Sequence, residues 1–276
     1  MDGTIIARDL AFPEGPVWLD GDLVFTEIEG GRVSRWSATG GVTPVAATGG
    51  GPNGATLGPN GALYVTQNGG MVAPGSEDLR VTPGIVRVGL DDGSVELVVT
   101  EVAGRRLDGP NDLAFGPDGR LYFTDPRGAA DPRHNPHPGR LFAVDLATGD
   151  GELVIELDAV FPNGIAFLGD GTLVWTESFS RRVMRLADGR PEVLIELPER
   201  HPPDGLCVGA DGTLFVATTY AHCVSVVRDG VIVERLMCGD GMVTNCCFGG
   251  TDLYVTDSRR GLLWTFPVGV EGLPLR

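Results

Sequence analysis

The chain has 276 residues, among them 42 glycines and 20 prolines, and a formal net charge of −16 at pH 7. This excess of negative charge repels phosphate groups, which argues against nucleic acid or an anionic membrane as a partner. The many glycines and prolines, with almost no apolar pattern of period 3.6, predict strands and turns rather than helices.

The beginning of the chain, MDGTIIARDLAF, has neither a basic segment nor a long apolar core. We therefore expect no signal peptide, and no later run approaches the length of a membrane span. Residues 4–11 of this segment form a predicted strand. The five cysteines are an odd number without zinc-ribbon spacing: Cys207, Cys223, Cys238, Cys246 and Cys247. Free thiols in a reducing, cytoplasmic environment are the expectation.

One hairpin pattern recurs along the chain. In its clearest copy, residues 109–125 (GPNDLAFGPDGRLYFTD), Asn111 precedes an apolar run, a Pro-Asp-Gly turn and an alternating strand that ends in Thr124 and Asp125. We call the residue at the position of Asn111 the mouth residue. The mouth residues of the six copies are Glu14, Asn53, Asn111, Asn163, Asp204 and Asn245. The interval from each to the Thr that closes the second strand, or to Ala217 in the fifth copy, is 12, 13, 13, 13, 13 and 11 residues.

Repeats of short strands at intervals of about 40–50 residues are typical of propeller blades. The fourth copy is the cleanest, with predicted strands near 165–168, 172–178, 183–186 and 192–197. The sequence thus predicts an all-β fold, a six-bladed β-propeller of four-stranded antiparallel blades, with residues 1–276 as a single domain. A β-sandwich or barrel is the alternative, because Asp-Gly and Asn-Gly turns are also common there.

The ends of the chain and two of its loops carry further predictions. The last copy, which ends with a strand over residues 262–268, lacks one strand, so we expect the N-terminal segment to complete it and remove an exposed sheet edge. Two loops on the side of the mouth residues are long, residues 68–83 and 126–139. Such loops could form a rim that covers a substrate, or they could be surface excursions without fixed structure.

The mouth residues should face one another around the propeller axis. All six side chains carry oxygen donors, and two are carboxylates, which would repel each other unless a cation were present. A single hard divalent ion is therefore predicted. The alternative is that Asn and Asp only form Asx turns, but this does not explain Glu14, because Glu is not a turn former.

Standard catalytic patterns are missing from the sequence. It contains no G-x-S-x-G, H-E-x-x-H or phosphate-binding G-x-x-x-x-G-K pattern, which argues against a serine or zinc hydrolase on a standard template. The histidines are scattered and are expected in loops or at the surface: His134, His137, His201 and His222.

The motifs around the mouth residues resemble those of the gluconolactonase, regucalcin and luciferin-regenerating enzyme family. They are FPEGPVW at Glu14, the segment 109–125 at Asn111, FPNGIAF at Asn163, PPDGLCV at Asp204 and TNCCFGG at Asn245. The resemblance runs from about residue 12 to residue 256. It implies a six-bladed propeller with one catalytic divalent cation, whose protein ligands match Glu14, Asn163 and Asp204. It also implies that Asn111 contacts the substrate or extends the metal shell, and that Asn53 faces the same funnel.

Two positions depart from relatives of this family. Asn53 falls where the more distant paraoxonases have a histidine; the diisopropylfluorophosphatases also share the ring with changed members. Gly109 stands where regucalcin-like members carry a substrate-holding arginine, so the resemblance leaves sugar-lactone specificity open.

These observations predict a metal-dependent lactonase, a carboxylic ester hydrolase with a small-molecule lactone, possibly of a sugar, as substrate. The cation would polarise the ester carbonyl, Asp204 would accept a proton from the attacking water, and Asn111 and Asn53 would orient the substrate. Calcium is the expected ion, with zinc, manganese, magnesium and ferrous iron as alternatives.

Two other functions stay open at this point. One is a phosphotriesterase or arylesterase on the same site, in which Asp204 would attack directly. The other is a cation-binding propeller without catalysis. In each case we expect a monomer or a small homo-oligomer.

Overall fold

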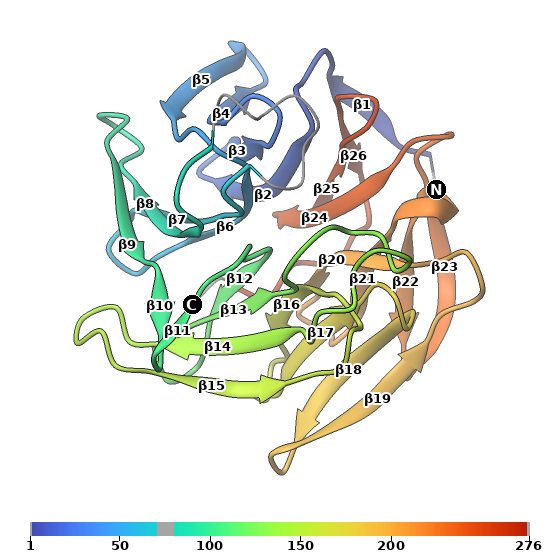
Figure 1. Cartoon of the computed structure of the whole chain (residues 1–276). Helices are drawn as coiled ribbons and strands as arrows, with labels where there is room; N and C mark the ends of the chain where they lie inside the picture. Colours follow the sequence, from blue (N-terminus) through green and yellow to red (C-terminus); the bar gives the residue numbers. More distant parts are fainter. Residues whose placement is uncertain (1, 71–79, 275–276) are drawn as a thin grey trace.

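The computed structural model describes residues 2–70 and 80–274. Within them the chain forms six four-stranded antiparallel sheets, which are arranged around a common axis as a six-bladed β-propeller (Figure 1). The first strand of each blade lies nearest the axis, and the later strands follow outward. The all-β, six-bladed prediction is confirmed. The one helical element of the described residues is a short 3-10 helix, η2 (Thr219–Ala221).

The blades follow one another along the chain. Blade 1 contains β2 (Pro13–Leu19), β3 (Asp22–Glu27), β4 (Arg32–Ser37) and β5 (Gly41–Ala47). Blade 2 contains β6 (Pro52–Leu57), β7 (Leu63–Gln67), β8 (Gly84–Val88) and β9 (Val95–Val99). A small hairpin of β10 (Glu101–Val102) and β11 (Arg105–Arg106) follows. Blade 3 contains β12 (Leu113–Phe115), β13 (Leu121–Asp125), β14 (Arg140–Val144) and β15 (Gly151–Glu156).

Blade 4 contains β16 (Pro162–Phe167), β17 (Leu173–Glu177), β18 (Arg182–Ala187) and β19 (Arg190–Glu196), so each predicted strand is present with ends shifted by at most three residues. Blade 5 contains β20 (Pro203–Val208), β21 (Leu214–Thr218), β22 (Cys223–Arg228) and β23 (Val231–Met237). Blade 6 contains β24 (Val243–Gly249), β25 (Asp252–Asp257) and β26 (Leu262–Phe266).

The N-terminal strand β1 (Thr4–Ala7) completes blade 6, as predicted. It pairs antiparallel with β26, with Thr4 opposite Thr265 and Ile5 opposite Trp264. The strand is shorter than expected, because the backbone turns at Asp9, which has a positive φ of 61°, rather than continuing to residue 11. This pairing covers the edge of β26 and joins the two ends of the ring.

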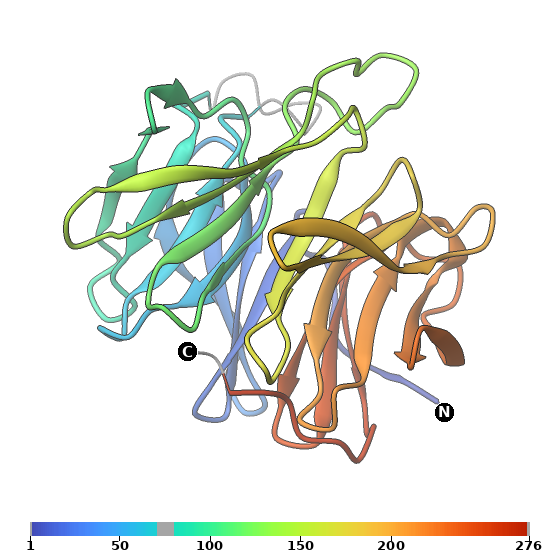
Figure 2. The same cartoon turned by 90° about the horizontal axis from the view of Figure 1, so that it is seen from below.

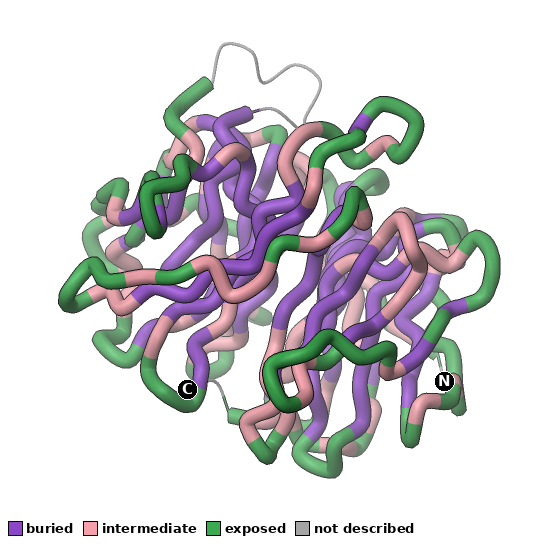
Figure 3. The backbone as a smooth tube through the Cα atoms, turned by 60° about the horizontal axis from the view of Figure 1, so that its bottom comes forward, coloured by how far each residue is buried: buried purple, intermediate pink, exposed green. Residues whose placement is uncertain are grey.

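The core lies between neighbouring blades rather than inside any single sheet. The largest fully buried side chains, which include Trp175, Phe25 and Phe142, lie mostly on the second and third strands of their blades. The outermost strands, such as β5 and β23, are exposed over most of their length. Figure 3 shows this gradient from buried inner strands to exposed loops and edges. Burial of apolar surface between blades, at roughly 25 cal/mol per Å², therefore stabilises the ring as a whole.

The constant interval within the sequence repeat has a structural cause. A threonine near the end of the second strand donates its hydroxyl hydrogen to the backbone oxygen of the mouth residue in the next blade. The bonds are Thr26 Oγ1 to Asn53 O, 2.6 Å, Thr66 Oγ1 to Asn111 O, 2.6 Å, Thr124 Oγ1 to Asn163 O, 2.7 Å, and Thr176 Oγ1 to Asp204 O, 2.6 Å. Two junctions lack this bond. Ala217 has no hydroxyl, and Thr256 donates to the Asn245 backbone oxygen of its own blade, at 3.2 Å. The repeat thus sets the spacing of mouth residues around the axis.

The two faces of the propeller differ. The loop 126–139 projects from the face where the inner strands begin, while the C-terminal segment crosses the opposite face (Figure 2). Asn135 Nδ2 donates to the backbone oxygens of Arg127 and Ala129, at 2.6 and 2.9 Å, and so gives this loop a defined shape. Of the other long loop, residues 71–79 lie outside the described residues. No helix of the described chain is long and apolar enough to cross a membrane.

Candidate functional site

Each blade brings one mouth residue to the axis. Five of the six are the second or third residue of an inner strand, and Asn111 lies just before β12. In five blades the pairing of the first two strands is irregular at this point, for example between Glu14 and Val17 and between Pro203 and Leu206. A bulge of this kind bends a strand and re-aims its side chains. The bulges therefore provide a local reason why these polar side chains can turn toward the axis.

Glu14, Asn163 and Asp204, the three predicted metal ligands, lie close together. Burial raises the pKa of Asp204 well above its usual range, and the negative charges of Glu14 and Asp112 raise it further, while a hydrogen bond from Asn163 opposes them. Burial also raises the pKa of Glu14, against hydrogen bonds from Thr244, the Gly15 backbone N–H and Asn245. The Gly15 N–H lies 3.0 Å from Glu14 Oε2. The carboxyls are thus near enough to interact electrostatically.

A third buried carboxyl, Asp112, belongs to the same cluster and was not among the predicted site residues. Its Oδ1 accepts from the Leu113 N–H at 2.9 Å, and its Oδ2 accepts from Asn245 Nδ2 at 3.4 Å. Burial, with an added contribution from the charge of Glu14, raises the pKa of Asp112 to about 8. The sequence did contain a signal. The residue after the mouth residue is glycine in four copies of the repeat but aspartate in the third.

The glycines at this position leave room for the polar side chains. A Cβ atom on Gly54 would lie 2.2 Å from Asp112 Oδ1, and one on Gly205 would lie 2.2 Å from Asn245 Oδ1. Only a residue without a side chain permits such an approach. Each glycine therefore makes space for a polar group from the neighbouring blade.

Asn53 and Asn111, the predicted substrate contacts, occupy the same ring but differ from the others. Both are buried. Their backbone oxygens are held by Thr26 and Thr66, whereas their side-chain amides form no hydrogen bond with any residue the structure describes. These two amides have donors and acceptors to offer to a ligand.

The donor set of the cluster fits a hard cation. It consists of carboxylate and amide oxygens, and no arginine or histidine contributes to the pKa shifts of Glu14, Asp112 or Asp204. Uncompensated buried carboxylates of this kind are costly unless a cation neutralises them. Among residues 2–70 and 80–274, no three His, Cys, Asp or Glu side chains are placed to hold an ion by themselves. Amide oxygens would therefore have to complete the coordination of any ion here.

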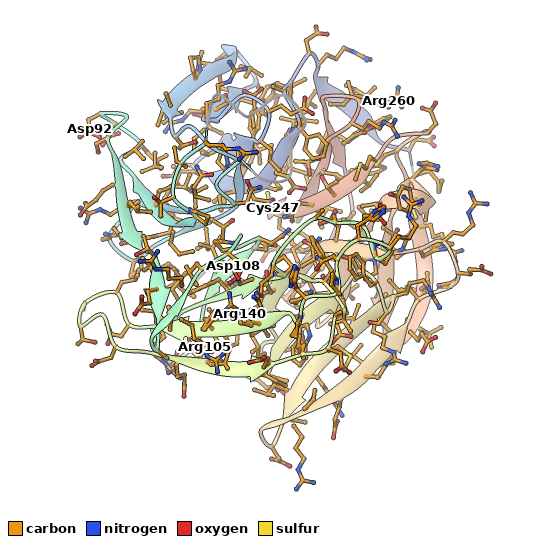
Figure 4. All side chains as sticks on the ribbon, in the orientation of Figure 1. Asp92, Arg105, Asp108, Arg140, Cys247 and Arg260 are labelled. Carbon is orange, nitrogen blue, oxygen red and sulfur yellow. The ribbon has the colours of Figure 1, made fainter. Side chains whose placement is uncertain are left out.

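A buried ion pair holds the segment that precedes Asn111. Arg140 is largely buried, and its Nη2 atom lies 2.6 Å from Asp125 Oδ2 and 3.1 Å from Asp108 Oδ2. Asp125 Oδ1 in turn accepts from the Gly109 N–H at 2.9 Å. Figure 4 shows Asp108 and Arg140 on this side of the axis. The pair holds the segment that leads to Asn111.

A cavity of about 310 Å³ occupies the axis behind the ring, on the side of the C-terminal segment. We call it the rear cavity. All six inner strands line it, with side chains that are mostly apolar, such as Trp18 and Phe248, and Leu273 and Pro274 border it at the C-terminal end. Asp112 and Asn245 are its polar contribution from the ring. The cysteines Cys207, Cys246 and Cys247 also line it, and Figure 4 shows Cys247 near the axis.

The histidines do not take part in the ring. His134 and His137 lie exposed in the loop 126–139, and the Nδ1 atoms of His201 and His222 lie within hydrogen-bond reach of the backbone oxygens of Glu199 and Gly241.

Comparison with known proteins identifies related chains. A family model described as the SMP-30/gluconolactonase/LRE-like region matches residues 12–267. The gluconolactonase of Zymomonas mobilis is 26% identical over 93% of this chain and 79% of that protein. The pentonolactonase XacC of Haloferax volcanii is 29% identical over 88% of this chain and 80% of that protein. The solved structure of a gluconolactonase from Xanthomonas campestris, 24% identical, shares the fold with a TM-score of 0.77 over 98% of this chain and 89% of that one.

Proposed function

The chain belongs to the SMP-30/gluconolactonase/LRE-like family, and from this premise we propose that it is a lactonase that opens a lactone with water at the ring of mouth residues. The observation that carries the proposal is the convergence of Glu14, Asn163 and Asp204 at the propeller axis. The names of two relatives, a gluconolactonase and a pentonolactonase, support a lactone of a sugar as the substrate class.

We propose that one divalent cation, calcium in the first place, binds to Glu14, Asn163 and Asp204. Such an ion, when bound, acts as a Lewis acid toward an ester carbonyl. The all-oxygen donor set supports calcium, magnesium or manganese more than zinc or iron, because hard ions prefer oxygen ligands. The groups that act on Glu14, Asp112 and Asp204 are other carboxyls and neutral hydrogen-bond donors, which supports a cation from outside the chain.

In this proposal Asp204 is the catalytic base that accepts a proton from the attacking water. The hydrogen bond from the Asn163 amide orients its carboxylate, and the Thr176 hydroxyl holds its backbone oxygen at 2.6 Å. Glu14, on blade 1 and two blades away from Asp204, is the second carboxylate among the mouth residues. Asn53 and Asn111, whose amides are without a partner among the described residues, orient the lactone through hydrogen bonds.

A substitution at Asp204 tests this role. Asp204→Asn keeps the shape of the side chain, and we expect it to lower kcat on a responsive lactone by at least about 100-fold, the usual contribution of a positioned base. Asp91→Asn, at an exposed turn, serves as the matched control and should retain full activity. Circular dichroism and melting curves check that both variants are folded. Near-normal turnover in Asp204→Asn would exclude the assigned role.

A second experiment tests the cation. Purified protein is analysed for its metals, stripped with a chelator and supplied with calcium, magnesium, manganese, zinc or ferrous iron in turn. We expect one ion to raise the melting temperature and to restore hydrolysis of a panel of sugar and aliphatic lactones. An ion that raises the melting temperature without turnover of any lactone or ester would indicate a cation-binding propeller instead.

Water labelled with heavy oxygen separates the lactonase mechanism from direct attack by Asp204. In a single turnover the label enters the hydroxy-acid product when water attacks. If Asp204 is the nucleophile, the label enters its carboxylate first.

A further inference from the structure

The rear cavity contains a pair of thiols that the proposed hydrolysis does not use. Cys207 lies on β20 of blade 5 and Cys246 on β24 of blade 6, 39 positions apart in sequence. Their Sγ atoms are 3.5 Å apart. Cys246 also donates its thiol hydrogen to the Phe215 backbone oxygen at 3.4 Å, so the hydrogen between the two sulfurs comes from Cys207.

The two sulfurs differ in access. Cys246 is almost completely buried, whereas Cys207 is half-buried and lines the rear cavity. Pro274, which borders the same cavity, is exposed to solvent. A small uncharged molecule that enters beside the C-terminal segment therefore meets Cys207 first.

We propose that Cys207 and Cys246 are a reversible oxidation site at which a small peroxide forms a disulfide between blades 5 and 6. In the first step the sulfur of Cys207 attacks one oxygen of hydrogen peroxide. The O–O bond breaks, water leaves and Cys207 becomes a sulfenic acid. In the second step the sulfur of Cys246 attacks the Cys207 sulfur, the S–S bond forms and a second water leaves. Two thiols thus lose two electrons, which reduce one peroxide to two waters.

The geometry permits this bond. A disulfide requires the sulfurs to close from 3.5 Å to about 2.05 Å, a small approach between the inner strands of two neighbouring blades. Burial raises the pKa of Cys207, and the neighbouring Cys246 raises it further. The Cys207 thiol is therefore neutral at neutral pH, so its oxidation is slow there and becomes faster as the pH rises and the thiolate fraction grows.

The other cysteines lack a comparable partner. Cys223 is buried beside the hydroxyls of Thr218 and Ser225. Cys238 is buried near the Leu236 backbone oxygen. Cys247 follows Cys246 on β24 and so points to the other side of the strand, where it packs beside blade 1 in the apolar cluster of Leu23 and Phe25.

A disulfide here would act on strands that carry ring residues. Cys207 stands three positions after Asp204, and Cys246 directly follows Asn245, the partner of Asp112. Drawing the two inner strands together would therefore shift these side chains. The effect on catalysis rests on the proposed function, whereas the disulfide itself does not.

The folded full-length protein is incubated with hydrogen peroxide at pH 7, 8 and 9, blocked with iodoacetamide and digested with trypsin and an Asp-specific protease. This digestion releases Cys207 alone in peptide 204–210 and Cys246 with Cys247 in peptide 240–251, apart from Cys223 and Cys238. We expect the two peptides to be linked in the oxidised sample, with a rate that increases with pH, and to separate after dithiothreitol.

Cysteine-to-serine variants identify which two sulfur atoms form the disulfide. The link should persist in Cys247→Ser and vanish in Cys246→Ser and in Cys207→Ser, all three chosen because serine keeps the size of the side chain. A folded wild-type protein that shows no link, or a link that depends on Cys247, would overturn the proposal. Since Cys207→Ser could alter folding, the near-ultraviolet circular dichroism of each variant is compared with that of the parent.

The rate of lactone hydrolysis measures the effect of the disulfide on the ring of mouth residues. We expect oxidised wild-type protein to lose turnover and regain it with dithiothreitol, while Cys246→Ser keeps its activity under peroxide. If no lactone is hydrolysed by the reduced protein either, the proposed function fails, yet the peptide link still decides whether the oxidation site exists. A link that forms without any change in the turnover of an active enzyme would show that the effect on the ring is wrong.

Discussion

Asn245 Nδ2 donates to Asp112 Oδ2 across 3.4 Å, although the two residues are 133 positions apart in sequence. The bond crosses the propeller axis from blade 6 to blade 3. It joins the side chain of a mouth residue to a carboxyl that also feels the charge of Glu14. The electrostatics of the ring are therefore set by three carboxyls rather than two.

The substitution Asp112→Asn tests the contribution of this third carboxyl. It replaces a carboxyl whose ionisation is opposed by burial and by the charge of Glu14 with a neutral amide. Folding then no longer requires the uptake of a proton at this position, so we expect the metal-free protein to melt at a higher temperature than the parent. We expect its affinity for the activating cation to fall by about 10-fold or more, the usual effect of removing a supporting group. Differential scanning calorimetry and calorimetric metal titration measure the two quantities, with Asp91→Asn as the control. A metal affinity equal to that of the parent would show that Asp112 does not act on the ion.

Thr176→Val tests the hydrogen bonds between blades. Valine keeps the shape of threonine but leaves the Asp204 backbone oxygen, now accepting at 2.6 Å, without this partner. We expect a loss of about 1–3 kcal/mol in the free energy of unfolding, the cost of an unsatisfied buried acceptor. Urea titration measures the loss. Thr43→Val on the exposed strand β5 is the control and should change stability little. Equal stability of the two variants would contradict the structural role of the repeat.

Deletion of residues 2–10 tests the closure of the ring. It removes the strand paired with β26 and the Ile6 backbone oxygen, which accepts from Trp36 Nε1 at 3.1 Å. We expect the melting temperature to fall by many degrees and the exposed edge of β26 to promote association. Calorimetry and light scattering measure both effects, with deletion of Asp2 alone as the control. A truncated protein as stable as the parent would refute the closure.

The carboxyl of Glu27 should make the fold sensitive to acid. Burial alone would raise its pKa, but hydrogen bonds from Arg32, the Ala11 N–H and Ser34 outweigh burial and lower it. A carboxyl whose pKa is lowered in the folded state contributes stability above its unfolded pKa, and that stability is lost as the pH falls through the folded pKa. We expect the free energy of unfolding to decline below about pH 4.5 as this contribution is lost.

In Glu27→Gln this part of the decline should be absent, and the variant should be less stable than the parent at pH 7, because the ion pair with Arg32 at 2.7 Å is lost. Unfolding by urea between pH 3 and 7 measures the difference. Glu29→Gln, two positions further along and exposed, is the control. Parallel pH curves for Glu27→Gln and the parent would contradict the assignment.

The repeat made most of the fold predictable. A hairpin at nearly constant spacing defines the blades, and the polar residue at its beginning must lie near the axis of any closed ring. The pairing of β1 with β26 followed from the strand missing in blade 6. By contrast, the end of β1 at Ala7 depends on a turn at Asp9 that the residue pattern did not predict.

The sequence by itself determined the number of blades and the position of each mouth residue along them, because both are local and repeat with fixed spacing. Only the tertiary structure decided which side chains meet across the axis, since contacts such as Asn245 with Asp112 and Cys207 with Cys246 join different blades. Distances between blades depend on how their sheets pack, through glycines such as Gly54 and threonines such as Thr176. A local sequence pattern does not describe that packing. The position of Asp112 among the ring carboxyls and the contact between the two thiols are therefore seen only in the tertiary structure.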